Sequence, residues 1–194
     1  MNFHPNSIYH VYNRGNNKQN IFFEKRNYDY FIKKIELELT PICDVLAYCL
    51  MLNHFHLLIY VPEKTMGLNL LTNQSQQFLV RKFGTIQSSY CQAINKQENR
   101  TGSLFQQKTK AKLLNTDCYI LTCFYYIHQN ALKAKLVKKM EEWTHSSFKD
   151  YLAETSALCK ISTARELIQI PLGKEDFYKE SHKMIEPDLI KSIF

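Results

Sequence analysis

Short segments rich in β-forming residues alternate along the chain with longer segments in which apolar residues recur every three or four positions. The first pattern predicts strands at residues 8–13, 44–50, 54–61 and 104–114. The second predicts helices over residues 26–39, about 67–95 and 117–130, with Gly84 as a kink or break in the long one. This order predicts an α+β fold, an antiparallel β-sheet with helices packed on a face.

Composition favours one domain with an appendage over two full domains. The 194 residues are 45% hydrophobic and 13% aromatic, enough for a packed core, and no Gly/Ser-rich or Pro-rich linker divides them. We therefore expect a main domain over residues 1–151 and a helical extension over residues 152–194 with two short helical patterns.

Positive charge is concentrated in the middle of the chain. The net charge is +7, and residues 81–112 hold seven basic residues against one acid. Such a stretch favours a nucleic-acid partner, although a solvated helix face followed by a basic hairpin would give the same pattern. The candidate phosphate contacts are Arg81, Lys82, Lys108, Lys110 and Lys112.

The six cysteines show no C-x-x-C spacing and no disulfide-scaffold density, so we expect reduced, mostly buried thiols. The chain has neither a signal-peptide pattern at its start nor a run of roughly 20 apolar residues. A cytoplasmic location, with no membrane partner, is the expectation.

Two histidines carry the first chemical signal. His54 and His56 lie two positions apart in a predicted strand, so both imidazoles project from one face, where two ring nitrogens can hold a divalent cation. Taken alone, such a pair is more often a structural or surface coincidence, because two ligands leave most of a coordination sphere unfilled. A third ligand has to come from elsewhere in the chain.

The helix predicted at residues 117–130 carries the second signal. One of its faces is formed, at steps of three and four, by Tyr119, Thr122, Tyr126 and Asn130. A tyrosine hydroxyl one turn from an amide oxygen would place a nucleophile beside a metal ligand. The alternative is that Tyr126, one of 12 tyrosines, is an aromatic core residue.

Several ordered motifs together resemble a known family. The run Asn53-His54-Phe55-His56-Leu57-Leu58 resembles the His-x-His signature of the HUH superfamily. The run Tyr126-Ile127-His128-Gln129-Asn130 is similar to the tyrosine motif of the REP-associated tyrosine transposases, which are insertion-sequence-200-like, single-tyrosine transposases. Further similar stretches are residues 9–16, 102–107 and 143–147, so the resemblance covers about residues 8–151.

The resemblance implies a ferredoxin-like HUH palm in which His54, His56 and Asn130 bind a divalent metal, Mg²⁺ or Mn²⁺, and Tyr126 is the nucleophile. It implies single-stranded or hairpin DNA as the substrate, cleaved and rejoined through a 5′-phosphotyrosyl intermediate, and a monomer or a homodimer. Arg14 is a candidate for contacting DNA or supporting the site, but it equally fits a plain turn.

The chain departs from the family pattern at Leu52 and Ala131, where the family usually has proline. Tyr125 is a rival nucleophile, although it would point about 100° away from Tyr126 on the helix.

Three function classes follow. The leading one is a metal-dependent DNA transposase that acts through Tyr126. The second is a domesticated protein that binds DNA hairpins without cleaving them. The third is a metal hydrolase with water as its nucleophile, for which the expected carboxylate ligands are missing.

Overall fold

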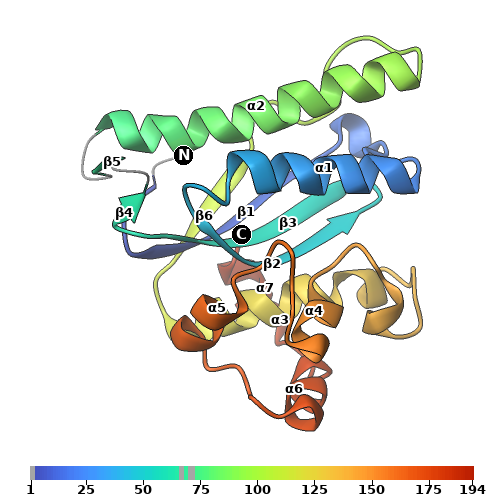
Figure 1. Cartoon of the computed structure of the whole chain (residues 1–194). Coiled ribbons are helices and arrows are strands. Elements are labelled where there is room, and N and C mark those ends of the chain that lie inside the picture. Colours follow the sequence, from blue (N-terminus) through green and yellow to red (C-terminus); the bar gives the residue numbers. More distant parts are fainter. Residues whose placement is uncertain (1–2, 66–67, 70–72) are drawn as a thin grey trace.

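A computed structural model describes residues 3–65, 68–69 and 73–194, without the side chains of residues 64–76 (Figure 1). Its centre is a four-stranded antiparallel sheet in the order β2-β3-β1-β6. The strands are β1 (Ser7–Arg14), β2 (Asp44–Met51), β3 (His54–Val61) and β6 (Lys110–Leu114). The short strands β4 (Lys64–Thr65) and β5 (Leu68–Asn69) form a separate pair. The predicted α+β class is confirmed.

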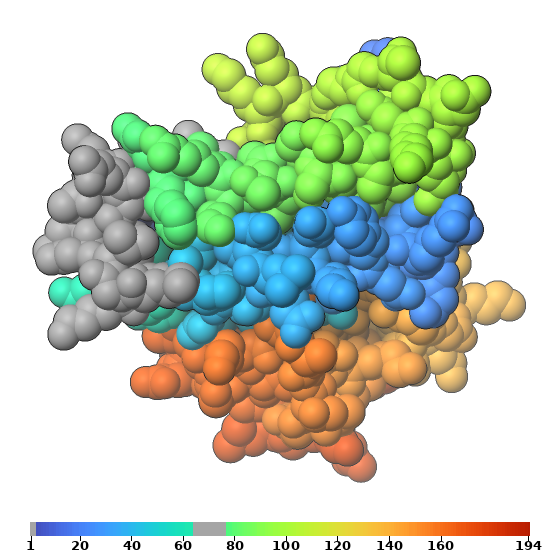
Figure 2. Space-filling view, turned by 45° about the horizontal axis from the view of Figure 1, so that its top comes forward, coloured from blue at the N-terminus to red at the C-terminus, as the bar shows by residue number. Residues whose placement is uncertain are grey.

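Helices cover both faces of the sheet (Figure 1). One face carries α1 (Lys25–Glu38) and α2 (Asn73–Gln97), and the other carries α3 (Asp117–Lys133). Around α3 lie α4 (Phe148–Ala153), α5 (Ile161–Leu167), α6 (Lys174–Ser181) and α7 (Pro187–Ser192). Two 3₁₀ turns, η1 (Asn16–Lys18) and η2 (Met140–Glu142), occur in loops. In Figure 2 the α2 and α1 segments form adjacent bands above the C-terminal segments.

Strand alternation divides the core into two clusters. Odd-numbered residues of β1 and β3, such as Tyr9 and Phe55, pack under α1 and α2. Ile8 and Leu58 face the other way and pack against α3. That second cluster includes buried residues from the predicted extension, namely Ala164, Ile168, Ile170, Phe177 and Ile193. The division at residue 151 stays a prediction, and α4 runs across it. All six cysteines are free, and four of them are buried.

The strand predicted at residues 104–114 is wrong in its first half. Only Lys110–Leu114 is a strand, and the earlier part makes a single bridge between Gly15 and Phe105. Leu104 and Phe105 are both buried in the cluster under α1 and α2, so the segment turns inward instead of continuing along the sheet edge. Its alternation of basic and neutral residues reflects a loop followed by a short strand.

The long predicted helix also differs at its start. Residues 68–69 belong to β5 and α2 begins at Asn73, while residues 67 and 70–72 of the prediction lie outside the described part of the chain. Within α2, Gly84 causes no break, because the helix is continuous from Asn73 to Gln97. A Cβ built at Gly84 would meet no atom within 4 Å.

Residues 143–147 cover the outer edge of β2. The Leu50 amide donates to the His145 carbonyl oxygen at 2.8 Å, and the Ser147 amide donates to the Tyr48 carbonyl oxygen at 3.0 Å. The indole N–H of Trp143 donates to the Leu50 carbonyl oxygen at 3.1 Å. This family-like stretch therefore satisfies the backbone groups of an edge strand, which would otherwise be open to pairing with another chain.

Candidate active site

A cavity of about 670 Å³ opens on the α3 side of the sheet, at the end where β1 finishes and β3 begins. Strand register brings the motifs together there, because Tyr12 lies opposite His56 and Arg14 lies opposite His54. The cavity is lined by Tyr12, Asn13, Arg14, Asn53, His54, His56, Gln106, Lys108, Lys110, Tyr126 and Phe194. As predicted from the sequence, His54 and His56 lie on one face of the sheet, and both line the same cavity as Tyr126 of α3.

The His54 ring is held through its Nδ1 atom. This atom lies 2.6 Å from Oδ1 of Asn53, and the Asn53 amide Nδ2 donates to the Lys18 carbonyl oxygen at 3.1 Å. The second bond turns Oδ1 toward His54, and an amide oxygen can only accept. His54 Nδ1 therefore carries the ring proton, and Nε2 keeps its lone pair.

Both candidate ligand histidines are uncharged at neutral pH. Burial, and then the charge of Arg14, lowers the pKa of His54 to about 4. Burial, followed by the charges of His10 and His54, holds the pKa of His56 well below its usual value. The ring centroids of His54 and His56 are 5.0 Å apart, with planes inclined at 82°. Neutral imidazole is the form that binds a metal.

Tyr126 reaches the cavity from α3. Thr116 is the N-cap of this helix, and its hydroxyl oxygen accepts a hydrogen bond from the Tyr119 amide at 3.2 Å. From there the Tyr126 ring comes to 5.5 Å from the His56 ring, measured between centroids. Burial raises the pKa of Tyr126 to about 12, although a hydrogen bond with the Asn130 side chain opposes the rise. The hydroxyl is therefore protonated at neutral pH.

Asn130 lies on α3 one helical turn after Tyr126, and its side chain interacts with both Tyr126 and His54. Its Nδ2 atom donates to the Tyr126 carbonyl oxygen at 2.9 Å, which leaves Oδ1 as an acceptor. A side-chain hydrogen bond with Asn130 also acts on the pKa of His54. The Asn130 side chain thus lies beside His54, where a third metal ligand would have to be.

Tyr125 faces away from the cavity. Only 7% of it is exposed, in the cluster that α3 forms with the C-terminal helices. Burial raises its pKa to about 12, and the charges that act on it are those of Glu180 and Arg165. The rival nucleophile is thus in the core.

The predicted cationic residues divide between the two sides of the sheet. Arg14, Lys108 and Lys110 line the cavity, and no acid is found among the described residues that do so. Lys112 lies further along β6, opposite His10. Arg81 and Lys82 belong to α2 on the other face, where Lys82 Nζ pairs with Glu38 at 2.8 Å.

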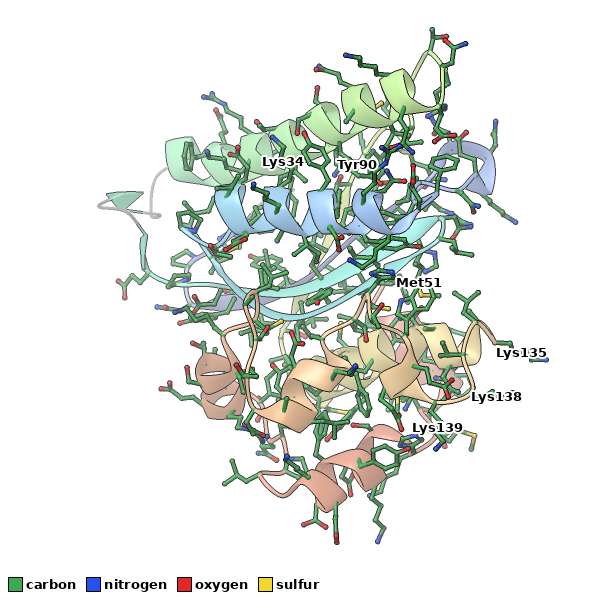
Figure 3. The ribbon with its side chains drawn as sticks, turned by 45° about the vertical axis from the view of Figure 1, so that its right-hand side comes forward. Lys34, Met51, Tyr90, Lys135, Lys138 and Lys139 are labelled. Carbon is green, nitrogen blue, oxygen red and sulfur yellow. The ribbon has the colours of Figure 1, made fainter. Side chains whose placement is uncertain are left out.

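Several residues at or next to the site, among them His10 and Phe194, had no role assigned from the sequence. His10 contacts His56 and is fully buried, and Phe194 packs its ring 5.4 Å from that of Tyr126, between centroids. His10 lies in the family-like stretch of residues 9–16, whereas nothing in the local sequence marks Phe194. Figure 3 also shows Lys135, Lys138 and Lys139 projecting near the C-terminal end of α3, outside the basic stretch found from charge.

The donor set fits a divalent metal. Two neutral imidazoles and an amide oxygen form a mixed nitrogen and oxygen set that suits Mn²⁺, and Mg²⁺ less well. Within the described part of the chain, no group of three or more His, Cys, Asp or Glu residues could hold a metal ion. A metal at this site would therefore depend on the amide of Asn130.

Comparisons with known proteins bear on the fold. Searches of protein-family models and of curated proteins gave no match. Among solved structures, the chain is similar to a REP-associated tyrosine transposase bound to a REP hairpin, with a TM-score of 0.59. The match covers 79% of this chain and 83% of that one. The two proteins share a fold.

Their sequences are only 16% identical, so the similarity establishes the architecture and leaves the chemistry to the site residues. Separately, in residues 3–65, 68–69 and 73–194 no helix is long and apolar enough to cross a membrane.

Proposed function

We propose that this protein is a metal-dependent DNA transposase that cleaves and rejoins single-stranded or hairpin DNA through Tyr126. One observation carries the proposal: β3 and α3 bring two neutral imidazoles and the Tyr126 side chain into one cavity that Arg14, Lys108 and Lys110 make cationic, and the Asn130 amide lies beside His54. The fold is that of a transposase solved with a DNA hairpin, which supports the same class of substrate here.

In the proposed reaction, the Tyr126 oxygen attacks a backbone phosphorus and the bond from phosphorus to the 3′-oxygen breaks. The tyrosine gives up its proton to the surrounding water, and the leaving 3′-oxygen takes one up. The products are a 5′-phosphotyrosyl DNA and a free 3′-hydroxyl. Because one ester replaces another, a different 3′-hydroxyl can reverse the step and rejoin DNA without an energy source.

The chain's own residues supply position and charge. Arg14 lines the cavity, where its guanidinium can donate to a phosphate oxygen. Lys110 Nζ lies over the Tyr12 ring, 5.8 Å from its centroid, and both side chains line the cavity, where they can contact a DNA strand. A metal held by His54, His56 and Asn130 would neutralise charge on the scissile phosphate.

A second candidate is a domesticated protein that binds hairpins without cleaving them. The Phe194 ring favours it, because it packs against both Tyr126 and His56, with centroids 5.4 Å and 6.0 Å apart. The raised pKa of Tyr126 also favours the non-cleaving protein, because it disfavours the phenolate form that would act as the nucleophile. The intact set of site residues favours the transposase.

A covalent adduct distinguishes the two candidates. The purified full chain is incubated with labelled hairpin DNAs and Mn²⁺ or Mg²⁺, and products are separated on a denaturing gel. We expect an adduct with the natural chain and with Tyr125→Phe, and none with Tyr126→Phe. Tyr125→Phe is the matched control, because the neighbouring hydroxyl is removed from the core and not from the cavity.

Each other result has a definite meaning. Hairpin binding without any adduct would support the non-cleaving protein. An adduct that persists in Tyr126→Phe would refute the proposed nucleophile, and cleavage without an adduct that survives the same substitution would indicate a hydrolase that uses water.

A further inference from the structure

His10 connects a candidate metal ligand to the C-terminal segment. Its Nε2 atom lies 2.8 Å from Nδ1 of His56, and its Nδ1 atom lies 2.8 Å from the carbonyl oxygen of Ile193. His10 is fully buried, and the rings of His10 and His56 are stacked with centroids 5.0 Å apart. A chain of two hydrogen bonds therefore runs from the end of α7 to His56.

The chemistry of the last acceptor fixes the direction of both bonds. A carbonyl oxygen only accepts, so the proton on His10 must be on Nδ1. The ring faces an imidazole and a carbonyl, neither of them negatively charged, so burial favours its neutral form, in which Nε2 accepts. His56 must then donate from Nδ1, and its Nε2 atom keeps the lone pair.

His54 reaches the same state by an independent route. Its Nδ1 donates to the Asn53 amide oxygen, as described above, so both imidazoles carry the proton on Nδ1. For two histidines on one strand face, this leaves the two Nε2 atoms as the matched pair of donor atoms. Hydrogen bonds of this kind orient metal-ligating histidines and raise their basicity.

We propose that His10 is a positioning residue that holds His56 in the tautomer and orientation needed to bind the metal. The inference deepens the proposed function and rests on it for the metal. His10 itself does not line the cavity, so its effect on DNA and metal passes through His56. The Ile193 carbonyl makes the C-terminal segment part of the same support.

The tautomer can be measured without any metal. In the ¹⁵N-labelled, metal-free protein, long-range ¹H–¹⁵N correlation spectra distinguish the protonated from the unprotonated ring nitrogen. We expect His56 to carry its proton on Nδ1 alone in the natural chain. In His10→Phe, which keeps an aromatic ring but no nitrogen, we expect a mixture of the two tautomers. A His56 protonated on Nε2 in the natural chain would overturn the inference.

Metal affinity is the second readout. With Mn²⁺ alone, titrated by calorimetry, we expect His10→Phe to bind about 10–100-fold more weakly than the natural chain. His10→Gln, which can place an amide oxygen near His56 Nδ1, should recover most of the affinity. An unchanged affinity in His10→Phe would contradict the positioning role.

His128→Phe is the matched control for these variants. His128 is also buried, with 1% exposure, but it hydrogen-bonds Ser147 Oγ at 2.8 Å in the core, away from the cavity lining. The same substitution there should leave Mn²⁺ affinity unchanged. Thermal melting of each variant checks that it folds. If His10→Phe does not fold, the spectrum of the natural chain still shows which nitrogen of His56 carries the proton.

The two proposals can fail separately. A natural chain that binds neither Mn²⁺ nor Mg²⁺ would refute the metal in the proposed function, while the tautomer spectrum would still test the hydrogen bond between His10 and His56. Conversely, if the protein forms the adduct and His10→Phe leaves its Mn²⁺ affinity unchanged, only the positioning role is refuted.

Discussion

The two faces of the central sheet are built from the same strands but have different contents. Toward α1 and α2, β1 and β3 present apolar and aromatic side chains such as Val11, Phe55 and Leu57, each at most 1% exposed. Toward α3, the neighbouring positions in the sequence are histidines, a tyrosine and an arginine. One face is a continuous core, whereas the other is core at one end and a polar cavity at the other.

This difference separates stability from chemistry. Aromatic packing under α1 and α2 needs no particular partner atom, so its contribution follows buried area and fit. On the α3 side, each buried polar group needs a partner, as His10 and His56 show. Substitutions on the two faces should therefore have different effects, even at adjacent residues.

Adjacent residues of β3 give the largest expected contrast. Phe55→Ala opens a cavity in the aromatic cluster and should lower the free energy of unfolding by about 3–5 kcal/mol. His56→Ala leaves His10 Nε2 without its partner, which should cost about 1–3 kcal/mol, but should abolish the DNA adduct. Urea denaturation and the adduct assay measure the two effects. Full adduct formation by His56→Ala would remove the distinction between the faces.

A pH titration tests the buried histidine in the core on the α3 side. Burial lowers the pKa of His128 from 6.5 to about 3. Between these values the unfolded chain binds a proton that the folded chain does not. The contribution to stability is therefore complete above pH 6.5 and falls as the pH decreases, by about 1.4 kcal/mol per pH unit for one histidine.

His10 and the cavity histidines add to the same trend, so the informative comparison is with His128→Phe. In urea denaturation at pH 7, 6 and 5, we expect stability to fall less steeply in the variant than in the natural chain. Parallel curves would show that His128 is not held neutral by the fold.

The cationic residues give a smaller contrast across the sheet. Lys110 lines the cavity, whereas Arg81 is exposed on α2, on the other face. Lys110→Gln should weaken hairpin binding and reduce the slope of log affinity against log salt by about 0.7–1. Arg81→Gln should leave the slope unchanged. Equal effects would mean that DNA contacts both layers, as the charge pattern alone had suggested.

Much of this division could be predicted from the sequence, because it depends on local periodicity. Alternation at residues 54–61 separates Phe55 from His56, and steps of three and four place Tyr126 and Asn130 on one helix face. The failure at residues 104–109 has a tertiary cause. Leu104 and Phe105 are buried under α1 and α2, so alternation there did not mean a strand.

The hydrogen bonds behind His56 could not be predicted in this way. His10 and His56 are 46 positions apart, and only the register of β1 against β3 makes them neighbours. The Ile193 acceptor is a backbone carbonyl, which every residue has, so no residue type signals it. The sequence thus points to the atoms that face the substrate more readily than to those that support them.

The smallest expected effect is on the outside of the α1 and α2 layer, at Gly84. This glycine lies within the continuous helix α2, and an added Cβ would meet no atom within 4 Å. Gly84→Ala should raise the free energy of unfolding by about 0.5–1 kcal/mol, because alanine loses less conformational entropy in a helix. Adduct formation should not change. A loss of stability would mean that α2 bends at Gly84 in solution, as the sequence had suggested. The helix layer on this face of the sheet would then depend on a glycine, and not only on the apolar packing beneath it.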